Sequence, residues 1–241
     1  MCSSDLSSLP VTWRIPALEI EPGTPLEESL CACYGGVDAY DIHGLETAQC
    51  MSERRTGGEA GVRSVHAVRG GKVWSLLAER PQTVALLLAA LSRSHTLSPP
   101  PGFSYAVPTL DHARRVCPEP VGYFIEHLDG FHTTLLLLNG LVQDFNWAGR
   151  VKGSDRLLSC QMYLPMPPAQ STLANFFSPL MHNVEETFLS GKAAYPVERT
   201  LLTSGLVVFA VESLYRGEVP LLTPELKVAY APPARSSFWR S

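Results

Sequence analysis

The sequence predicts an α+β fold with an open, predominantly antiparallel sheet and helices packed on one of its faces. Three observations lead to this prediction. Four β-rich runs follow one another in the middle of the chain, Asp-Gly, Asn-Gly and Gly-Ser-Asp turns separate them, and helical patterns flank them on both sides. Asp-Gly and Asn-Gly between β-rich runs are the strongest short-range signals of a hairpin. We therefore expect a four-strand antiparallel meander, extended by edge strands.

The meander strands are expected over residues 122–128, 131–139, 142–152 and 157–164. The four leucines at 135–138 do not alternate with polar residues, so both faces of their strand should be covered. The helices cover one face. The other face requires a second layer, either a partner subunit or the interior of the monomer. Of these two, we expect a partner subunit, so that the protein forms a homo-oligomer through this sheet face.

The remaining elements follow from periodicity and from their end signals. Residues 81–93 predict a helix, because Pro81 suits a first helical position and leucines recur at helical spacing after it. The other elements expected are strands over 29–34, 61–68 and 226–230, an extension of the pairing over 72–78, and helices over 110–117, 171–190 and 197–216.

The densest polar stretch surrounds one further helix. The glycines at 35–36 break the preceding strand, Asp38 is a suitable N-cap, and Asp41 falls in the first turn, where its carboxylate meets the positive end of the helix dipole. Two arginines at 54–55 fall in the last turn, and Gly57 is placed as the residue after the C-cap. The helix is therefore expected to begin just after Asp38 and to end with the two arginines.

This helix carries the candidate site. At helical spacing His43 and Glu46 share a face. In the functional interpretation, His43 is an acid/base or substrate-binding group oriented by Asp38 or Asp41. In the alternative, both aspartates are caps and His43 is a packed core histidine. A metal site is not expected, because Asp41 and His43 lie two residues apart and point to different sides of a helix.

Substrate-binding candidates complete this set. Asp41 and Glu46 belong to it through their place on the helix. Residues 7–16 read as an extended segment that carries Trp13 and Arg14 outward, and we add both side chains as substrate-binding candidates.

The amino-acid composition limits the classes of partner that this protein is expected to bind. A hydrophobic content of 45%, a charged content of 17% and a net charge of −4 over 241 residues are typical of a globular protein. The negative charge and the lack of a basic run argue against nucleic acid, and no apolar run is long enough to cross a membrane. The six scattered cysteines match no common zinc or redox spacing, so reduced thiols in the cytoplasm are expected.

The first six residues, MCSSDL, resemble a translated sequencing adapter, so we expect residues 1–6 to be an assembly artefact or disordered and the natural protein to continue upstream. Residues 7–232 are expected to form a single domain and residues 233–241 a tail. The chain has no G-x-G-x-x-G dinucleotide fingerprint, P-loop, H-E-x-x-H or G-x-S-x-G motif.

The order of elements and the segment Gly35, Gly36, Asp38, His43 and Glu46 resemble the C-terminal domain of the glucose–fructose oxidoreductase/inositol dehydrogenase/MocA family. The likeness extends over about residues 7–232 and includes the stretches VERTLLTSG and TPELKVAY. It departs from the family at four points. Ala39 stands where the family has aspartate, Asp41 stands where it commonly has glycine, and Glu46 stands for the final aspartate. The chain also has no Glu-Lys-Pro turn.

The resemblance implies a substrate-binding and dimerisation domain whose Rossmann half is missing. It implies a sugar or polyol-like substrate, NAD or NADP bound by the full-length parent, no cofactor bound by this chain alone, and His43 and Asp38 as the catalytic pair. The cofactor-binding residues stay unknown. The chain alone is expected to be an inactive fragment of an oxidoreductase.

Two alternatives stay open. A non-catalytic binding or scaffold module that keeps the fold is favoured by Ala39 and by the missing lysine. A free-standing hydrolase or isomerase that uses His43 and Glu46 is the remote option.

Overall fold

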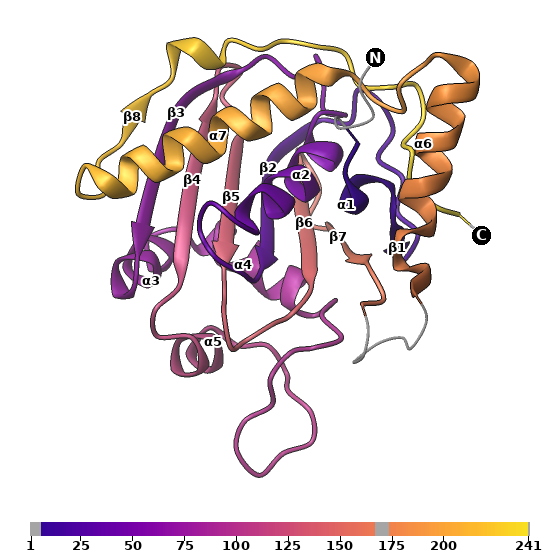
Figure 1. Cartoon of the computed structure of the whole chain (residues 1–241). Coiled ribbons are helices and arrows are strands. Elements are labelled where there is room, and N and C mark those ends of the chain that lie inside the picture. Colours follow the sequence, from indigo (N-terminus) through magenta and orange to yellow (C-terminus); the bar gives the residue numbers. More distant parts are fainter. Residues whose placement is uncertain (1–5, 167–173, 241) are drawn as a thin grey trace.

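The computed structural model describes residues 6–166 and 174–240, and an eight-stranded sheet forms its centre (Figure 1). The strands lie in the order β1-β7-β6-β2-β5-β4-β3-β8. In the described ranges every neighbouring pair is antiparallel except β2 and β5, so the expected α+β fold with a predominantly antiparallel open sheet is confirmed. The strands are β1 (Trp13–Ile15), β2 (Leu26–Cys33), β3 (Val62–Arg69), β4 (Val121–His127), β5 (His132–Leu137), β6 (Phe145–Val151), β7 (Leu157–Tyr163) and β8 (Leu221–Leu222).

The helices confirm most of the periodic patterns. The helices expected over 81–93, 110–117 and 197–216 form within two residues of those bounds, whereas the start of the one expected over 171–190 falls partly outside the described residues. The helices are α1 (Ser8–Val11), α2 (Asp41–Ser52), α3 (Gly71–Ala78), α4 (Pro81–Leu91), α5 (Leu110–Val116), α6 (Ser178–Ser190) and α7 (Val197–Tyr215), with short 3₁₀ turns η2 (Ala174–Phe177) and η3 (Pro224–Leu226). No helix in the described ranges is both long enough and apolar enough to cross a lipid bilayer.

The four consecutive strands form, but they are not a meander. β4 pairs with β5 and β6 pairs with β7, whereas β2 lies between β5 and β6 and runs parallel to β5. β2 can occupy this central place because its second half, residues 29–33, is buried on both faces. The Asn139-Gly140 pair is therefore not a hairpin turn; it begins a connection that carries the chain past the end of β2.

Helices cover both faces of the sheet, so the prediction that they pack on one face is wrong. α2 and α7 lie on the face drawn in front in Figure 1, and α3, α4 and α5 pack on the other. The four leucines at 135–138 divide between the two cores: Leu135 and Leu137 pack with α2, and Leu136 and Leu138 pack with α4. Both faces of this strand are covered, as predicted, but by the monomer itself. Self-association through an open sheet face is not supported by this arrangement.

Two local predictions are also wrong. Residues 72–78, expected to extend the strand pairing, form α3, because Gly70 reverses the chain at a positive φ of 60°. Residues 226–230 form no strand: the chain makes the turn η3, and only Tyr230 pairs with the backbone of Glu59. The expected tail is partly packed, since Phe238 is buried and Trp239 pairs with Trp13.

Candidate functional site

The turn before α2 is organised by Asp41. Its carboxylate accepts backbone N–H bonds from Asp38 (3.0 Å), Ala39 (3.1 Å) and Ile42 (3.0 Å), and a hydroxyl bond from Tyr123 (2.8 Å). The Asp41 side chain is fully buried. With four donors around it, this carboxylate serves to hold the turn and the start of α2.

Asp38 is not the N-cap of the helix, so that prediction is wrong. α2 begins at Asp41, and Asp38 is exposed in the turn before it at a φ of 56°. The far end also differs, because α2 ends at Ser52 and Arg54 and Arg55 follow it as buried side chains. Arg54 binds a carboxylate and carbonyls of other segments, whereas Arg55 donates to the Ser52 carbonyl at the end of α2 as well as to carboxylates beyond it.

His43 and Glu46 form a hydrogen-bonded pair on the first turns of α2. His43 Nδ1 lies 3.1 Å from Glu46 Oε2, and the Ser7 hydroxyl donates to the same carboxylate oxygen at 2.5 Å. Where a carboxylate is ionised it only accepts hydrogen bonds, so Nδ1–H is then the donor of this contact, and in the tautomer that donates from Nδ1 the other nitrogen, Nε2, is an acceptor. Among the described residues Nε2 has no partner. The predicted shared face of His43 and Glu46 is confirmed.

A cavity of about 100 Å³ lies beside His43. Space of this size holds several water molecules or part of a small ligand. Tyr34 packs 5.4 Å from Phe145 between ring centroids, and the His43 ring makes edge contacts with Tyr40 at 5.8 Å and with Phe145 at 6.3 Å. Four aromatic rings thus form one part of the cavity wall, beside aliphatic and polar side chains and one imidazole that remains 35% exposed. The lining residues are Ser8, Leu9, Tyr34, Tyr40, His43, Gln143, Asp144, Phe145, Gln161, Met162, Leu164, Met166 and Phe177.

The other predicted site residues lie elsewhere. Asp38 borders a separate groove of about 280 Å³ against Ser204 and Val208 of α7, so the structure does not bring it to His43. Arg14 is buried, donates to Leu18 O at 2.8 Å and lies 4.3 Å above the Phe238 ring, so the prediction that it points outward is wrong. Trp13 is half-buried on β1 and does not line the cavity.

Sequence reasoning missed the aromatic wall. Tyr34 follows β2, Phe145 begins β6 and Phe177 precedes α6, so no local pattern joins them. Ser7 was also missed, because its contact with Glu46 depends on how the N-terminal segment crosses α2. Among these rings only Tyr34 could have been found from the sequence, because it directly precedes the glycine pair that leads into the helix.

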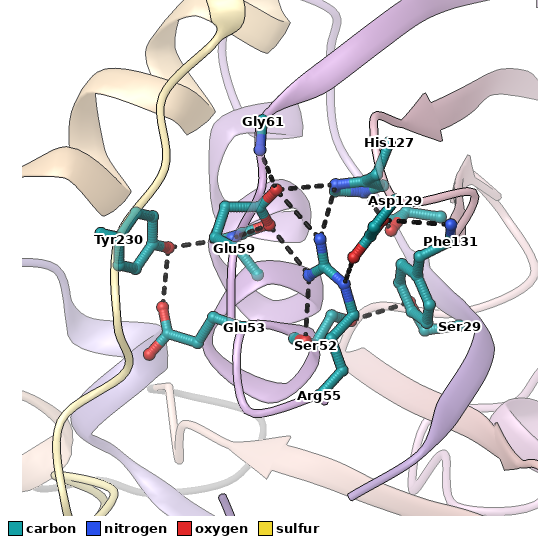
Figure 2. Close-up of polar contacts among 12 residues, drawn as sticks. Ser29, Ser52, Glu53, Arg55, Glu59, Gly61, His127, Asp129, Phe131 and Tyr230 are labelled. Atoms are coloured by element: carbon teal, nitrogen blue, oxygen red, sulfur yellow. Dashed lines mark hydrogen bonds and ion pairs between the residues drawn. The ribbon is translucent and has the colours of Figure 1, made fainter. Parts of the chain in front are cut away.

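A buried polar network follows the end of α2 (Figure 2). The Glu59 carboxylate accepts from Arg55 at 3.0 and 3.1 Å, from Gln49 at 2.7 Å and from His127 Nδ1 at 3.0 Å. Burial raises the pKa of Glu59, but the His127 and Arg55 contacts together lower it well below its usual range. Tyr230 donates to Glu53 at 2.8 Å and so ties the network to the C-terminal segment. We assign this cluster a structural part, since every carboxylate in it is already paired.

The described residues contain neither a cluster of metal ligands nor a G-x-G-x-x-G fingerprint. No three His, Cys, Asp or Glu side chains within the described ranges are grouped to hold a metal ion. β2 and β5, the parallel pair of the described sheet, are not followed by a glycine-rich turn of the G-x-G-x-x-G kind.

No family model and no curated protein matches the sequence. Solved structures give weak similarities. A putative myo-inositol dehydrogenase from Sinorhizobium meliloti 1021 has a TM-score of 0.43 at 11% identity, and a myo-inositol dehydrogenase from Corynebacterium glutamicum has 0.41 at 13%. Both similarities cover 82% of this chain and 56% of the other. A levoglucosan dehydrogenase in complex with NADH and levoglucosan has 0.40 at 10%, covering 84% and 60%. The chain therefore spans little more than half the length of these dehydrogenases, and similarity at this level carries no conclusion about function.

Proposed function

We propose that this chain is the substrate-binding domain of a sugar or polyol oxidoreductase, and that His43 accepts the proton of the reacting hydroxyl group. The observation that carries the proposal is the His43–Glu46 pair at the wall of the aromatic cavity. The sequence resemblance supports the same substrate class.

The pair has the chemistry of a general base. Because Glu46 accepts from Nδ1, the neutral ring presents Nε2 as its proton acceptor, and the carboxylate stabilises the imidazolium that forms when the proton arrives. Ser7 donates to the same oxygen of Glu46 and so restricts its rotation. A hydroxyl group placed within about 3 Å of Nε2 could transfer its proton directly.

The cavity walls suit a polyol. Ligand sites are mostly apolar, with a few polar groups that set the orientation. The rings of Tyr34, Tyr40 and Phe145 offer flat surfaces to the C–H faces of a sugar. His43 offers one polar contact, and further polar side chains of the lining offer others. Asp38 is kept as a catalytic candidate only if it reaches the ligand from its own groove.

Alcohol oxidation also needs a hydride acceptor. NAD or NADP, which the resemblance implies, would supply it, but the described residues do not fit a dinucleotide. We therefore derive no hydride step from this chain and place the cofactor on another domain or subunit.

Ligand titration tests the proposal. myo-Inositol and glucose are added to the whole chain while the backbone amide NMR signals of Tyr34 and Phe145, which line the cavity and are present in every variant, are followed. We expect saturable shifts in the wild type and in the control variant His182→Ala, whose histidine lies on α6 beside Trp239. His43→Ala should bind at least tenfold more weakly. The proposal would be refuted if the folded His43→Ala variant bound these compounds as tightly as the wild type. It would also be refuted if neither myo-inositol nor glucose gave a saturable shift.

A non-catalytic binding module is the second candidate. No lysine or arginine is among the described lining residues, so His43 lacks the cationic neighbour that alcohol oxidation would use to stabilise an alkoxide. Turnover in a full-length protein separates the two candidates. A binding module predicts that His43→Ala leaves any dehydrogenase turnover unchanged, whereas the oxidoreductase proposal predicts its loss.

A further inference from the structure

A second cavity, of about 180 Å³, lies across β3, β4 and β5 and shares no lining residue with the His43 cavity. The sheet register builds it from two rows of side chains. Ser64, Glu126 and His132 stand side by side in one row. The second row consists of His66, Phe124 and Thr134. Alternation along each strand places both rows on the face that Phe124 shares with α3 and α4.

Arg80 enters this cavity from the junction of α3 and α4. Its guanidinium carbon lies 4.9 Å from the centroid of the Phe124 ring. Stacking on an aromatic ring holds the guanidinium plane and leaves its N–H edges free to bind. Among the described residues no carboxylate lies within ion-pair distance of Arg80, and the side chain is exposed to solvent.

The acidic neighbours are already neutralised by other cations. Glu126 pairs with Arg63 at 3.2 Å, and Glu218 pairs with Lys72 at 3.2 Å. Two negative charges thus meet two positive charges, and Arg80 remains as the uncompensated charge at this face.

The field of Arg80 extends over the cavity to His66. Burial lowers the pKa of His66, and the charges of Lys72 and Arg80 lower it further, against the opposing hydrogen bond and charge of Glu218. Lys72, Arg80 and Glu218 are thus the charged groups that act on His66, and Glu126 and His132 stand in the adjacent row.

We propose that this cavity is a second ligand site, which binds a small oxyanion group, a carboxylate or a phosphate, on the guanidinium of Arg80. The guanidinium fork matches either group with two parallel hydrogen bonds. The site is independent of the His43 cavity, so it stands or falls apart from the polyol proposal.

The oxyanion class follows from the donors present. Arg80 can only donate, and Thr134 adds a hydroxyl from the floor of the cavity. The charge of Arg80 repels a cation, and the one carboxylate of the lining, Glu126, is paired with Arg63. An uncharged polyol would leave the charge of Arg80 unbalanced, whereas an oxyanion removes it.

The test titrates the whole chain with inorganic phosphate and, in a separate arm, with acetate at constant ionic strength. Backbone amide and imidazole NMR signals of His66, His132 and Thr134 report binding. We expect saturable shifts in at least one arm, and a rise in the pKa of His66 as the bound anion screens Arg80. Saturation with phosphate alone assigns a phosphate ligand, and saturation with acetate alone assigns a carboxylate.

Two variants and a control make the test specific. Arg80→Ala should weaken binding at least tenfold, and Arg80→Lys should weaken it less, because it keeps the charge but loses the fork. Arg156→Ala removes an exposed arginine elsewhere on the surface and should bind like the wild type. Linear, unsaturated shifts in both arms, or equal binding by Arg80→Ala, would overturn the proposal.

Discussion

Gly35 and Asn139 exchange two hydrogen bonds although they are 104 residues apart in the sequence. The Gly35 N–H donates to Asn139 Oδ1 at 2.8 Å, and Asn139 Nδ2 donates back to the Gly35 carbonyl at 3.0 Å. The pair fastens the end of β2 to the connection that leaves β5. It therefore sets the position of the turn from which Tyr40 and His43 reach the cavity.

Removing the Asn139 amide should loosen this turn. Asn139→Ala loses both bonds and should lower the free energy of unfolding by about 1–2 kcal/mol, since a net hydrogen bond contributes about 0.5–1.5 kcal/mol. Asn139→Asp keeps the acceptor, so its free energy of unfolding should lie between those of Asn139→Ala and the wild type. Urea denaturation measures both. An Asn139→Ala variant as stable as the wild type would mean that the pair does not hold the turn.

Gly35 also has no room for a side chain. Its φ is 108°, and an added Cβ would lie 2.2 Å from the Cβ of Tyr40. Gly35→Ala should cost more than the roughly 1 kcal/mol of backbone strain alone, because the Tyr40 backbone would have to move. Gly23 is the matched control, since it has a φ of 86° with open space around it. Equal losses of thermal stability in Gly23→Ala and Gly35→Ala would show that the contact with Tyr40 does not matter.

We expect Glu59 to make the free energy of unfolding depend on pH. Burial raises the pKa of Glu59, but His127 and Arg55 outweigh burial and lower it below the value of about 4.3 expected for the unfolded chain. A depressed folded-state pKa means that the contribution is present above pH 4.3 and is lost as the pH falls further. Denaturation between pH 3 and pH 7 should show this slope.

Glu59→Gln should reduce the slope and should destabilise the protein at neutral pH by about 1.5–3 kcal/mol, because Arg55 loses charged hydrogen bonds to Glu59 but keeps its ion pair with Asp129. The exposed Glu225 serves as the control position, and Glu225→Gln should leave both the slope and the stability unchanged. A slope identical in Glu59→Gln and the wild type would assign the acid sensitivity to other carboxylates.

Glu53 and Arg199 form a second buried ion pair, joined by bonds of 2.8 and 2.5 Å, with Arg199 stacked 3.9 Å from the centroid of the Tyr195 ring. Arg199→Met should cost about 3–5 kcal/mol, since it leaves the Glu53 charge buried and unpaired. Adding Glu53→Gln should recover part of that loss, because the uncompensated charge disappears. A double-mutant cycle measures the coupling, and additive losses would contradict the pairing.

Glu46 should matter for ligand binding more than for folding. Glu46→Gln removes the charge that fixes the proton on His43 Nδ1, so polyol affinity should fall by about tenfold, the order expected for an outer hydrogen-bond partner. The exposed Glu185 of α6 offers a matched control, and Glu185→Gln should bind normally. Unchanged binding by Glu46→Gln would show that the Glu46 carboxylate does not orient His43 for the ligand.

Local patterns determined much of this fold. The helices over 81–93 and 197–216 were predictable because leucine spacing and end residues act within a few turns. The strand expected over 61–68 and the pairing of β4 with β5 across Asp129-Gly130 were predictable for the same reason. The contact of His43 with Glu46 also follows from helical spacing alone.

The tertiary structure alone decided the rest. The insertion of β2 between β5 and β6 depends on pairing between distant segments, which no local signal encodes, and it turns Asn139 from a hairpin residue into the partner of Gly35. Burial of Arg14 depends on where the C-terminal segment packs. The cavity beside His43 depends on rings from three separate segments. The sequence by itself determined the helices, most strands and the histidine–carboxylate pair, whereas long-range packing determined the strand order, the cover of both sheet faces and the surroundings of the site.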